Sequence, residues 1–235
     1  MNITKILNIP VQCFNNMEEA VDYILTNGSG KIAVAINPEK ILSALKSSKI
    51  KDVILSADIR YLDGIGTVKV AQSKLNKKLA RIPGCELWQA LMKEAGIQGK
   101  SVFLLGAEKT VVNNTKLKLE EKYGTNVLGT NDGFFHDDNL MISNILRLQP
   151  DILTVAMGSP RQEEFMNKCK AAGVTSFMMG VGGTYNVFTG NVKRAPKIWC
   201  DLGLEWLYRL ILEPSRIKRQ IKLLYFVWLF IRRKL

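Results

Sequence analysis

The chain has 235 residues, of which 47% are hydrophobic and 23% are charged, and it carries a formal net charge of +12. This balance excludes wholesale disorder, and the length suffices for one large domain or for a domain with an appendage. The positive charge indicates an anionic partner, either nucleic acid, anionic lipid or a phosphorylated substrate.

The excess charge is concentrated at the C-terminal end. The segment from Arg209 to Leu235 holds eight Lys/Arg residues and one acid, Glu213, so its net charge is +7 and the other 208 residues contribute +5. A nucleic-acid-binding domain more often interleaves basic and aromatic residues over its folded body. The distribution therefore favours a local anionic surface, such as that of a membrane, and we expect no nucleic-acid partner.

The cysteines and the single histidine are too scattered for a zinc site. Cys13, Cys85, Cys169 and Cys200 contain no CxxC pair, and His136 stands in the polar stretch DGFFHDDN. A zinc site needs such ligands at short spacing. We expect His136 to be a solvated loop residue and the cysteines to be reduced, buried small hydrophobic residues of a cytosolic protein. The first sixteen residues do not resemble a signal peptide.

Short β-rich runs alternate with helical patterns along the body of the chain. In chain order we expect a strand over 31–37, a helix from Pro38 to about Ser48, extended pieces over 52–57 and 59–64, a helix over 85–96 closed by Gly96, a strand over 101–106, a helix over 108–124, strands over 126–130 and 151–158, a helix over 159–173 and a strand over 176–183. Continuous apolar strands that alternate with helices predict an α/β fold, with a mostly parallel, Rossmann-like sheet and helices on both faces.

Glycine and polar residues gather at the carboxyl ends of the expected strands. These ends are Asn37, Asp63 with Gly64, Gly106, Gly158 to Gln162, and Gly180 to Asn186, which includes Gly182 and Gly183. Ligands of such sheets bind at these ends, where glycine lets the backbone approach and a following helix N-terminus favours phosphate. Each glycine alone is equally compatible with an ordinary turn, but five such ends favour a pocket for a nucleotide-type ligand.

Several common nucleotide motifs are missing. The sequence GVGGTYN is only loosely related to GxGxxG and has no acid on a second strand end about 20 residues later, and no Walker A lysine pattern occurs. The stretch HDDN lacks the DxD spacing that holds a metal-bound sugar nucleotide. These absences disfavour a nicotinamide enzyme, a P-loop ATPase and a metal-dependent transferase. We therefore expect no metal ligands, no cofactor and metal-independent activity.

The C-terminal segment predicts a basic amphipathic helix that Pro214 opens. One apolar stripe follows the helical period, and it consists of Ile217, Ile221, Leu224, Trp228 and Ile231. Basic side chains form another face, namely Arg216, Arg219 and Lys222. We expect a core domain over 1–203 and a C-terminal helical appendage over 204–235.

The apolar part of this helix is too short to cross a bilayer. The run LLYFVWLFI has nine residues and spans roughly 13 Å as a helix, against a hydrocarbon core of about 30 Å. It is suited to the membrane interface, with aromatic rings at headgroup level and arginines on anionic phosphates. The alternative is a helix that docks on the core of its own domain.

Six ordered motifs resemble those of the WecG/TagA/CpsF family, glycosyltransferase family 26. They are INPEK at Asn37, YLDGIG at Asp63, ARIPG at Arg81, AMGSPRQEEFM around Gln162, MGVGGTYNVFTGNVKRAPKIW, and LGLEWLYRLILEPSRIKRQ. The resemblance covers nearly the whole chain. It implies an inverting enzyme of bacterial surface-polysaccharide synthesis that moves an N-acetylmannosamine-type sugar from UDP onto GlcNAc-pyrophosphoryl-undecaprenol. It also implies a peripheral location on the cytoplasmic face of the inner membrane and allows a homo-oligomer.

The resemblance assigns roles to particular residues. It implies that Asp63 is the general base and that Asn37, Arg81 and Gln162 lie near the donor. The arginines that it places over the diphosphate are Arg209, Arg216 and Arg219.

The branch of the family is less well defined by the motifs. The long glycine-containing motif is most similar to the branch that transfers N-acetylmannosaminuronic acid in enterobacterial common antigen synthesis. The alternative is the N-acetylmannosamine transferase of wall teichoic acid, but that branch often has Thr where this chain has Ala35. Many members have Asp at the nucleotide-recognition position of Asn186. A non-catalytic membrane scaffold is the alternative of a different class, although a scaffold has no need of Asp63, Arg81 and Gln162 at strand ends.

Overall fold

The computed structural model describes residues 1–193, 195–201, 205–212, 217–232 and 234–235. Its centre is an eight-stranded sheet in the order β1-β2-β4-β3-β8-β7-β5-β6. The strands are β1 (Asn2–Ile6), β2 (Ile9–Cys13), β3 (Ile32–Ile36), β4 (Ile59–Leu62), β5 (Ser101–Gly106), β6 (Asn126–Asn131), β7 (Ile152–Ala156) and β8 (Phe177–Gly180). Only β1 and β2 pair antiparallel, so the prediction of a mostly parallel sheet is confirmed.

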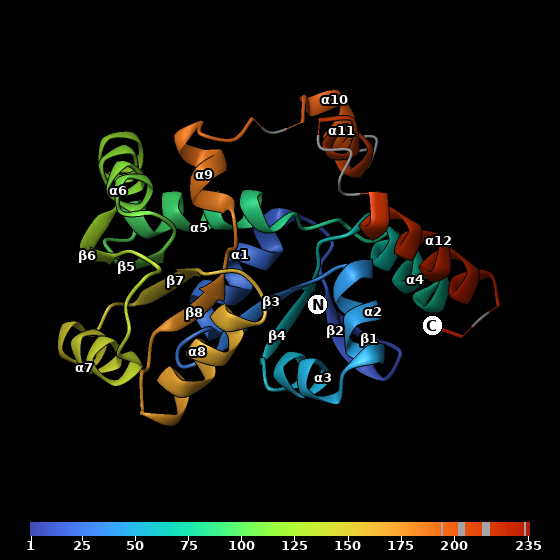
Figure 1. Ribbon diagram of the computed structural model, residues 1–235, viewed down its shortest axis with the longest axis horizontal. Helices are drawn as coiled ribbons and strands as arrows, with labels where there is room; N and C mark the ends of the chain where they lie inside the picture. The colour runs from blue at the N-terminus through green and yellow to red at the C-terminus, as the bar shows by residue number, and fades with distance from the viewer. Residues whose placement is uncertain (194, 202–204, 213–216, 233) are drawn as a thin grey trace.

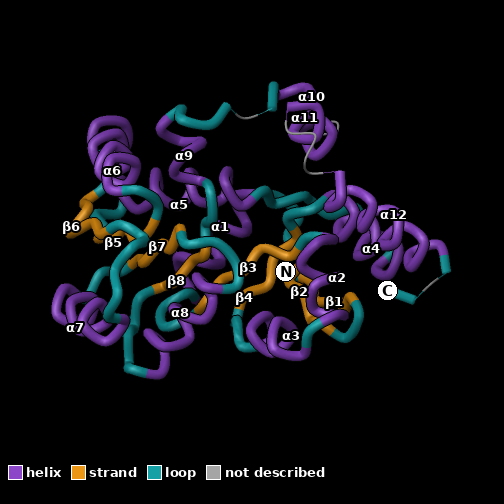
Figure 2. The backbone as a smooth tube through the Cα atoms, viewed as in Figure 1, coloured by secondary structure: helices purple, strands orange, loops and turns teal. Residues whose placement is uncertain are grey.

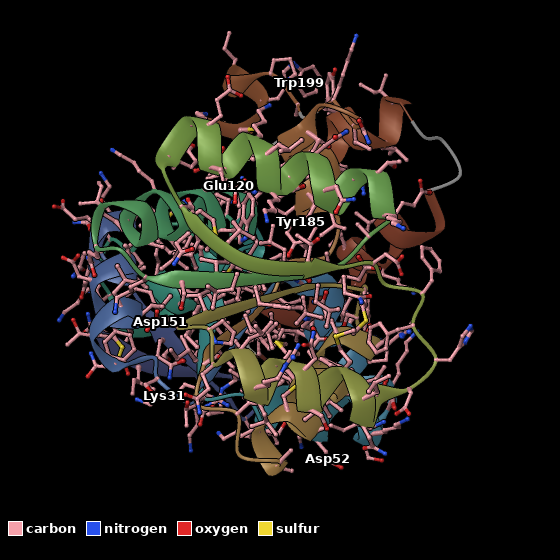
Figure 3. All side chains as sticks on the ribbon, turned by 90° about the vertical axis from the view of Figure 1, so that its left-hand side faces the viewer. Lys31, Asp52, Glu120, Asp151, Tyr185 and Trp199 are labelled. Atoms are coloured by element: carbon pink, nitrogen blue, oxygen red, sulfur yellow. The ribbon has the colours of Figure 1, made fainter. Side chains whose placement is uncertain are left out.

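Helices cover both faces of this sheet (Figures 1 and 2). One face carries α1 (Met17–Asn27), α5 (Gly84–Ile97), α6 (Lys109–Tyr123) and α9 (Thr184–Thr189). The other carries α2 (Pro38–Lys46), α3 (Ser48–Leu55), α4 (Ile65–Leu75), α7 (Asp138–Leu148) and α8 (Arg161–Ala171). Figure 3 shows the resulting layers edge-on, with Tyr185 between the sheet and the helix that carries Glu120. The chain is therefore an α/β protein of the Rossmann-like type.

The buried strands explain this layering. Along β5, Phe103 and Leu105 belong to the core on one face, whereas Val102 and Leu104 belong to the core on the other. All four side chains are at most 1% exposed. Because successive side chains of a strand point to opposite faces, an apolar run such as this one requires helices on both sides of the sheet.

One expected element was wrong. Residues 52–57 were expected to be extended, but Ser48–Leu55 form the helix α3, and the side chain of Ser47 caps it by accepting from the N–H of Ile50 at 3.4 Å. A short apolar run does not by itself distinguish a strand from a helix, and the Ser47 cap decides this case. The adjacent expectation of an extended piece at 59–64 is confirmed by β4.

The cysteines follow the prediction only in part. Cys13 and Cys169 are buried, and burial raises the pKa of the Cys13 thiol to about 11 and that of the Cys169 thiol to about 12. Cys85 and Cys200 are only partly buried. His136 is exposed in the loop between β6 and α7, as expected.

Three further helices, α10 (Lys197–Asp201), α11 (Glu205–Leu212) and α12 (Ile217–Ile231), follow the sheet. Helix α12 lies beside α2 and α4 (Figure 1), and it buries Phe226 and Leu229 in the core on that side. Of the predicted stripe, Leu224, Trp228 and Ile231 face the other way, because they are 71%, 44% and 73% exposed. The side chains of Ile217 and Ile221 lie outside the description. The docking alternative therefore holds for the face that carries Phe226 and Leu229. The opposite face is exposed, and its expected place at a membrane interface stays a prediction.

Among the helices described here, none combines the length and the apolar character needed to cross a membrane. The expected domain boundary at 203/204 lies outside the described residues.

Candidate active site

The sheet has a topological switch point between β3 and β8. These two strands are parallel neighbours, yet the chain leaves β3 into α2 on one face and leaves β8 into α9 on the other face (Figure 1). Ligands of open α/β sheets bind in the crevice that such a divergence creates outside the carboxyl ends of the strands. The residues at these two strand ends, and those beside them, therefore define the candidate site.

Asp63 follows β4 and is held on three sides. Its N–H donates to the carbonyl of Ile36 at 3.0 Å, which fixes the turn against the end of β3. Its carbonyl accepts from Arg81 Nε at 2.7 Å, and its Oδ1 accepts from the N–H of Gly84 at 3.3 Å. The half-buried carboxylate of Asp63 thus has a fixed backbone and one oriented oxygen. A side chain that must meet a reacting atom requires such fixed placement.

Asn37 lies against this turn. It caps α2, and its Oδ1 accepts from the N–H of Lys40 at 2.9 Å. A Cβ on Gly64 would stand 2.5 Å from Cδ of Pro38 and 3.1 Å from Cβ of Asn37, so glycine permits the Asp63–Gly64 turn to approach so closely. The structure therefore brings the predicted residues Asn37 and Asp63 together.

Gln162 connects the start of α8 to the end of β8. Its Oε1 accepts from the N–H of Gly182 at 3.1 Å, and its Nε2 donates to Glu163 Oε1 at 3.3 Å. The Gln162 side chain lies over Gly180, where a Cβ would stand 2.5 Å from Nε2. The predicted residues Gln162 and Gly182 are therefore in direct contact.

A buried ion pair, which the sequence did not indicate, joins α2, which follows Asn37, to α8, which carries Gln162. Lys40 Nζ lies 2.7 Å from Glu163 Oε1, with the two side chains only 14% and 2% exposed. Because Lys40 also donates its N–H to Asn37, a continuous chain of contacts runs from Asn37 through Lys40, Glu163 and Gln162 to Gly182.

The remaining predicted glycines play different parts. Gly106 packs on the backbone of Ala156 with φ +107, so it serves the close approach of β5 and β7. Gly158 and Gly182 have φ +77 and +52, which are conformations that favour glycine. Gly183 is exposed, and a Cβ on it would meet no atom within 4 Å.

Asn186 lies on α9 and is half-buried. Its neighbour Tyr185 is buried and fixes this helix to the sheet, because the Tyr185 hydroxyl lies 2.6 Å from Thr154 Oγ1 and donates to the Thr154 carbonyl at 3.0 Å.

Arg81 is directed toward the C-terminal segment as well as toward Asp63. Its Nη2 lies 3.0 Å from Glu205 Oε2 on α11, and its Nη1 donates to the carbonyl of Cys200 at 3.3 Å. The three predicted arginines of the C-terminal segment are described only in part. Arg209 and Arg219 lie on α11 and α12 with side chains outside the description, and Arg216 lies outside the described residues.

Tyr61 is a neighbour that sequence reasoning missed. It is fully buried on β4, and its hydroxyl finds no hydrogen-bond partner among the described residues. Burial, followed by the nearby charges of Asp63, Glu163 and Cys85, raises the pKa of its hydroxyl well above the usual value. It is therefore a neutral phenol behind the Asp63 turn, where a Cβ on Gly84 would stand 3.0 Å from it.

The arrangement is that of an α/β protein with its ligand crevice at the carboxyl edge of a mostly parallel sheet. Within the described residues, no cluster of three or more His, Cys, Asp or Glu side chains could hold a metal ion.

The sequence identifies the family. Residues 4–235 match the glycosyl transferase WecG/TagA/CpsF family, so this chain belongs to that family of glycosyltransferases. The match spans nearly the whole chain, including the C-terminal helices, and membership implies a sugar donor and an acceptor as substrates.

Proposed function

We propose that this protein is an inverting glycosyltransferase that moves N-acetylmannosaminuronic acid from its UDP derivative to GlcNAc-pyrophosphoryl-undecaprenol. The observation that carries the proposal is the half-buried Asp63 carboxylate, oriented by Gly84 at the end of β4 and beside Asn37, in a member of a glycosyltransferase family. The product would be the second lipid-linked intermediate of enterobacterial common antigen synthesis.

The proposed chemistry is one direct displacement. The 4-hydroxyl of the acceptor sugar attacks the anomeric carbon of the donor, the new C–O bond forms as the bond to UDP breaks, and Asp63 takes the hydroxyl proton. A positioned carboxylate is suited to this task as general base. Attack opposite to the departing UDP inverts the anomeric centre.

The leaving diphosphate needs positive charge, because negative charge develops on it as the bond breaks. Arg209, Arg216 and Arg219 are the groups proposed to supply that charge in place of a metal ion, so the reaction requires no divalent cofactor. Gly106, Gly158, Gly182, Gly183, Asn186 and Gln162 are proposed to line the donor site. Arg81 supports the same site from beside Asp63.

The acceptor is a lipid, so the enzyme must work at a membrane. The open face of α12 exposes Leu224, Trp228 and Ile231, and the cations Arg232 and Lys234 lie over the ring of Trp228. Such a face is suited to an anionic interface. We therefore propose a peripheral location on the cytoplasmic face of the bacterial inner membrane, with residues 1–203 as the catalytic core and 204–235 as the appendage.

Two sugars compete as donor. Ala35 departs from the threonine that is frequent in the branch acting in wall teichoic acid synthesis, which favours the uronic acid donor. The test gives purified full-length protein either UDP-N-acetylmannosaminuronic acid or UDP-N-acetylmannosamine, with a short-chain GlcNAc-pyrophosphoryl-prenol as acceptor.

Mass spectrometry of the lipid product and measurement of UDP release report the reaction. Faster transfer of the uronic acid supports the proposal, and faster transfer of the neutral sugar assigns the other branch. No transfer with either donor, together with intact vesicle binding, would instead indicate a membrane scaffold.

A further inference from the structure

The guanidinium of Arg81 joins two parts of the chain that are 124 positions apart in sequence. Its Nε holds the carbonyl of Asp63 at 2.7 Å, and its Nη2 meets Glu205 Oε2 at 3.0 Å. Its Nη1 also donates to the carbonyl of Cys200 at 3.3 Å. One side chain therefore touches the candidate catalytic turn and both α10 and α11.

The Arg81–Glu205 ion pair is largely shielded from water. The two side chains are 20% and 12% exposed, against 36% and 39% for the Lys116–Glu120 pair on α6. Exposed pairs of the second kind contribute little, whereas removal of one partner from a shielded pair leaves a desolvated charge without its counter-ion. The shielded geometry makes the Arg81–Glu205 contact a candidate for a specific role.

Glu205 also lies against the thiol of Cys200. Cys200 Sγ is 3.9 Å from Glu205 Oε2 and 3.4 Å from the carbonyl of Ala195. Cys200 of α10 and Arg81 therefore both contact the same carboxylate of α11. This proximity makes Cys200 a chemical reporter of whether the contact is formed.

We propose that Glu205 is a positioning residue, which acts through Arg81 to couple the docking of α10 and α11 to the placement of Asp63. When α11 is docked, Glu205 fixes the guanidinium, and the guanidinium fixes the carbonyl of Asp63. When α11 is displaced, Arg81 loses its counter-ion and the Asp63 turn loses one of its supports. This inference rests on the proposed function, because it takes the side chain of Asp63 as the carboxylate that reacts.

The proposal differs from a direct role of Arg81 at the diphosphate of the donor. A guanidinium that bound the donor alone would make Arg81 important and Glu205 dispensable. If the guanidinium instead links the docking of α11 to the position of Asp63, Arg81 and Glu205 act as one unit, and the effects of their substitutions are not additive.

A double-mutant cycle in the full-length protein tests the coupling, with Arg81→Gln, Glu205→Gln and the double variant. We expect each single variant to lower kcat/KM about tenfold, with the Kd of UDP little changed, and the double variant to be no worse than the more impaired single variant. Glu120→Gln makes the same substitution in the exposed pair on α6 and serves as the control. Multiplied losses in the double variant, or a Glu205→Gln variant with wild-type kcat/KM, overturn the proposal.

Alkylation of Cys200 provides a readout that does not depend on activity. Iodoacetamide labelling of the native full-length variants, followed by peptide mass spectrometry, compares Cys200 with the other partly buried thiol, Cys85. We expect Glu205→Gln and Arg81→Gln each to speed labelling at Cys200 several-fold and to leave Cys85 unchanged. Equal labelling of Cys200 in wild type and both variants contradicts a docking role.

The two proposals fail in different ways. If the wild-type enzyme transfers no sugar, the proposed function fails, while faster labelling at Cys200 in both variants still supports the contact. If transfer is normal but neither Cys200 labelling nor kcat/KM responds to Glu205→Gln, only the positioning role is wrong.

Discussion

Gln162 Oε1 accepts a hydrogen bond from the N–H of Gly182 at 3.1 Å, which ties the first turn of α8 to the end of β8. The contact lies on the crevice side of the sheet, because Gly182 comes just after Val181 at the end of β8, the strand that neighbours β3. Through Glu163 and Lys40 it continues to Asn37, beside the Asp63 turn. A continuous chain of contacts therefore joins the end of β3 to the end of β8 by way of α2 and α8.

The first prediction concerns the proposed base. Asp63→Asn should lower kcat by about 10²-fold or more, the usual scale for loss of a general base, since the amide cannot take the hydroxyl proton. Its oxygen can still accept from Gly84, so the unfolding temperature and the Kd of UDP should remain near wild type. Steady-state transfer rates and calorimetric UDP titration check this. Asp52→Asn, at an exposed position of α3, is the matched control. Near-normal turnover in Asp63→Asn would remove Asp63 from this role.

The second prediction compares two ion pairs that both reach α8. Lys40→Met leaves the buried Glu163 without its counter-ion, so it should lower the free energy of unfolding by about 3–5 kcal/mol. Lys49→Met breaks the pair with Glu164, in which the Lys49 side chain is 77% exposed, and should cost about 1 kcal/mol or less. Urea denaturation followed by tryptophan fluorescence measures both. Equal losses would mean that burial does not distinguish the two pairs.

Local signals in the sequence predicted the strand ends well. Asn37 followed by Pro38 marks the start of α2 because asparagine caps a helix and proline suits its first turn, and both features are observed. Asp63 was selected from a single turn after a β-rich run, and that turn does lie beside Asn37. Such features depend on neighbours in sequence, so sequence alone reveals them.

Contacts between distant segments could not be predicted in the same way. The Lys40–Glu163 pair joins residues 123 positions apart, and it exists because α2 and α8 cover the same face of the sheet. In sequence, Glu163 is simply an acid in the first turn of a helix, which the helix dipole already explains. Arg81 and Glu205 raise the same difficulty, since nothing local to either residue indicates the other. The family resemblance implies that Arg81 lies near the donor, but it does not indicate that Glu205 is its partner.

The third prediction uses the contact between Gly180 and Gln162. Gly180→Ala would bring a Cβ to 2.5 Å from Gln162 Nε2, so the Gln162 side chain must move and release the N–H of Gly182. We expect kcat/KM to fall by about tenfold, the scale of about 1.4 kcal/mol. In a Gln162→Ala background, Gly180→Ala should cause no further loss of kcat/KM, and the same transfer assay measures this. A further loss in the double variant would show that Gly180 acts by another route.

The fourth prediction concerns divalent ions. Because the proposed stabilisation of the diphosphate comes from arginine, transfer should proceed at an unchanged rate after dialysis against EDTA. Addition of Mg²⁺ or Mn²⁺ should then raise the rate less than twofold, apart from screening of charge, which an equal ionic strength of NaCl controls. A rate lost in EDTA and restored by either ion would contradict the metal-independent mechanism.

The last prediction separates the two faces of α12. Replacing Trp228 and Ile231 with serine changes only exposed positions, so the fold and transfer to a water-soluble acceptor analogue should be preserved, while flotation with anionic vesicles should be lost. Phe226→Ala acts on the opposite face, where Phe226 is 2% exposed and borders Gly66 of α4, and should reduce stability by about 3–5 kcal/mol.

Truncation extends the test of α12 to the tail arginines. Deletion of 223–235 should release the protein from vesicles, although it also removes the buried Phe226 and Leu229 and so should lower the unfolding temperature. Deletion from Arg209 should in addition abolish transfer to the soluble analogue, because Arg209, Arg216 and Arg219 would no longer reach the diphosphate. If the serine variant still floats with vesicles, the open face of α12 does not bind membranes. If the longer deletion remains active on the soluble acceptor, the arginines do not stabilise the leaving group.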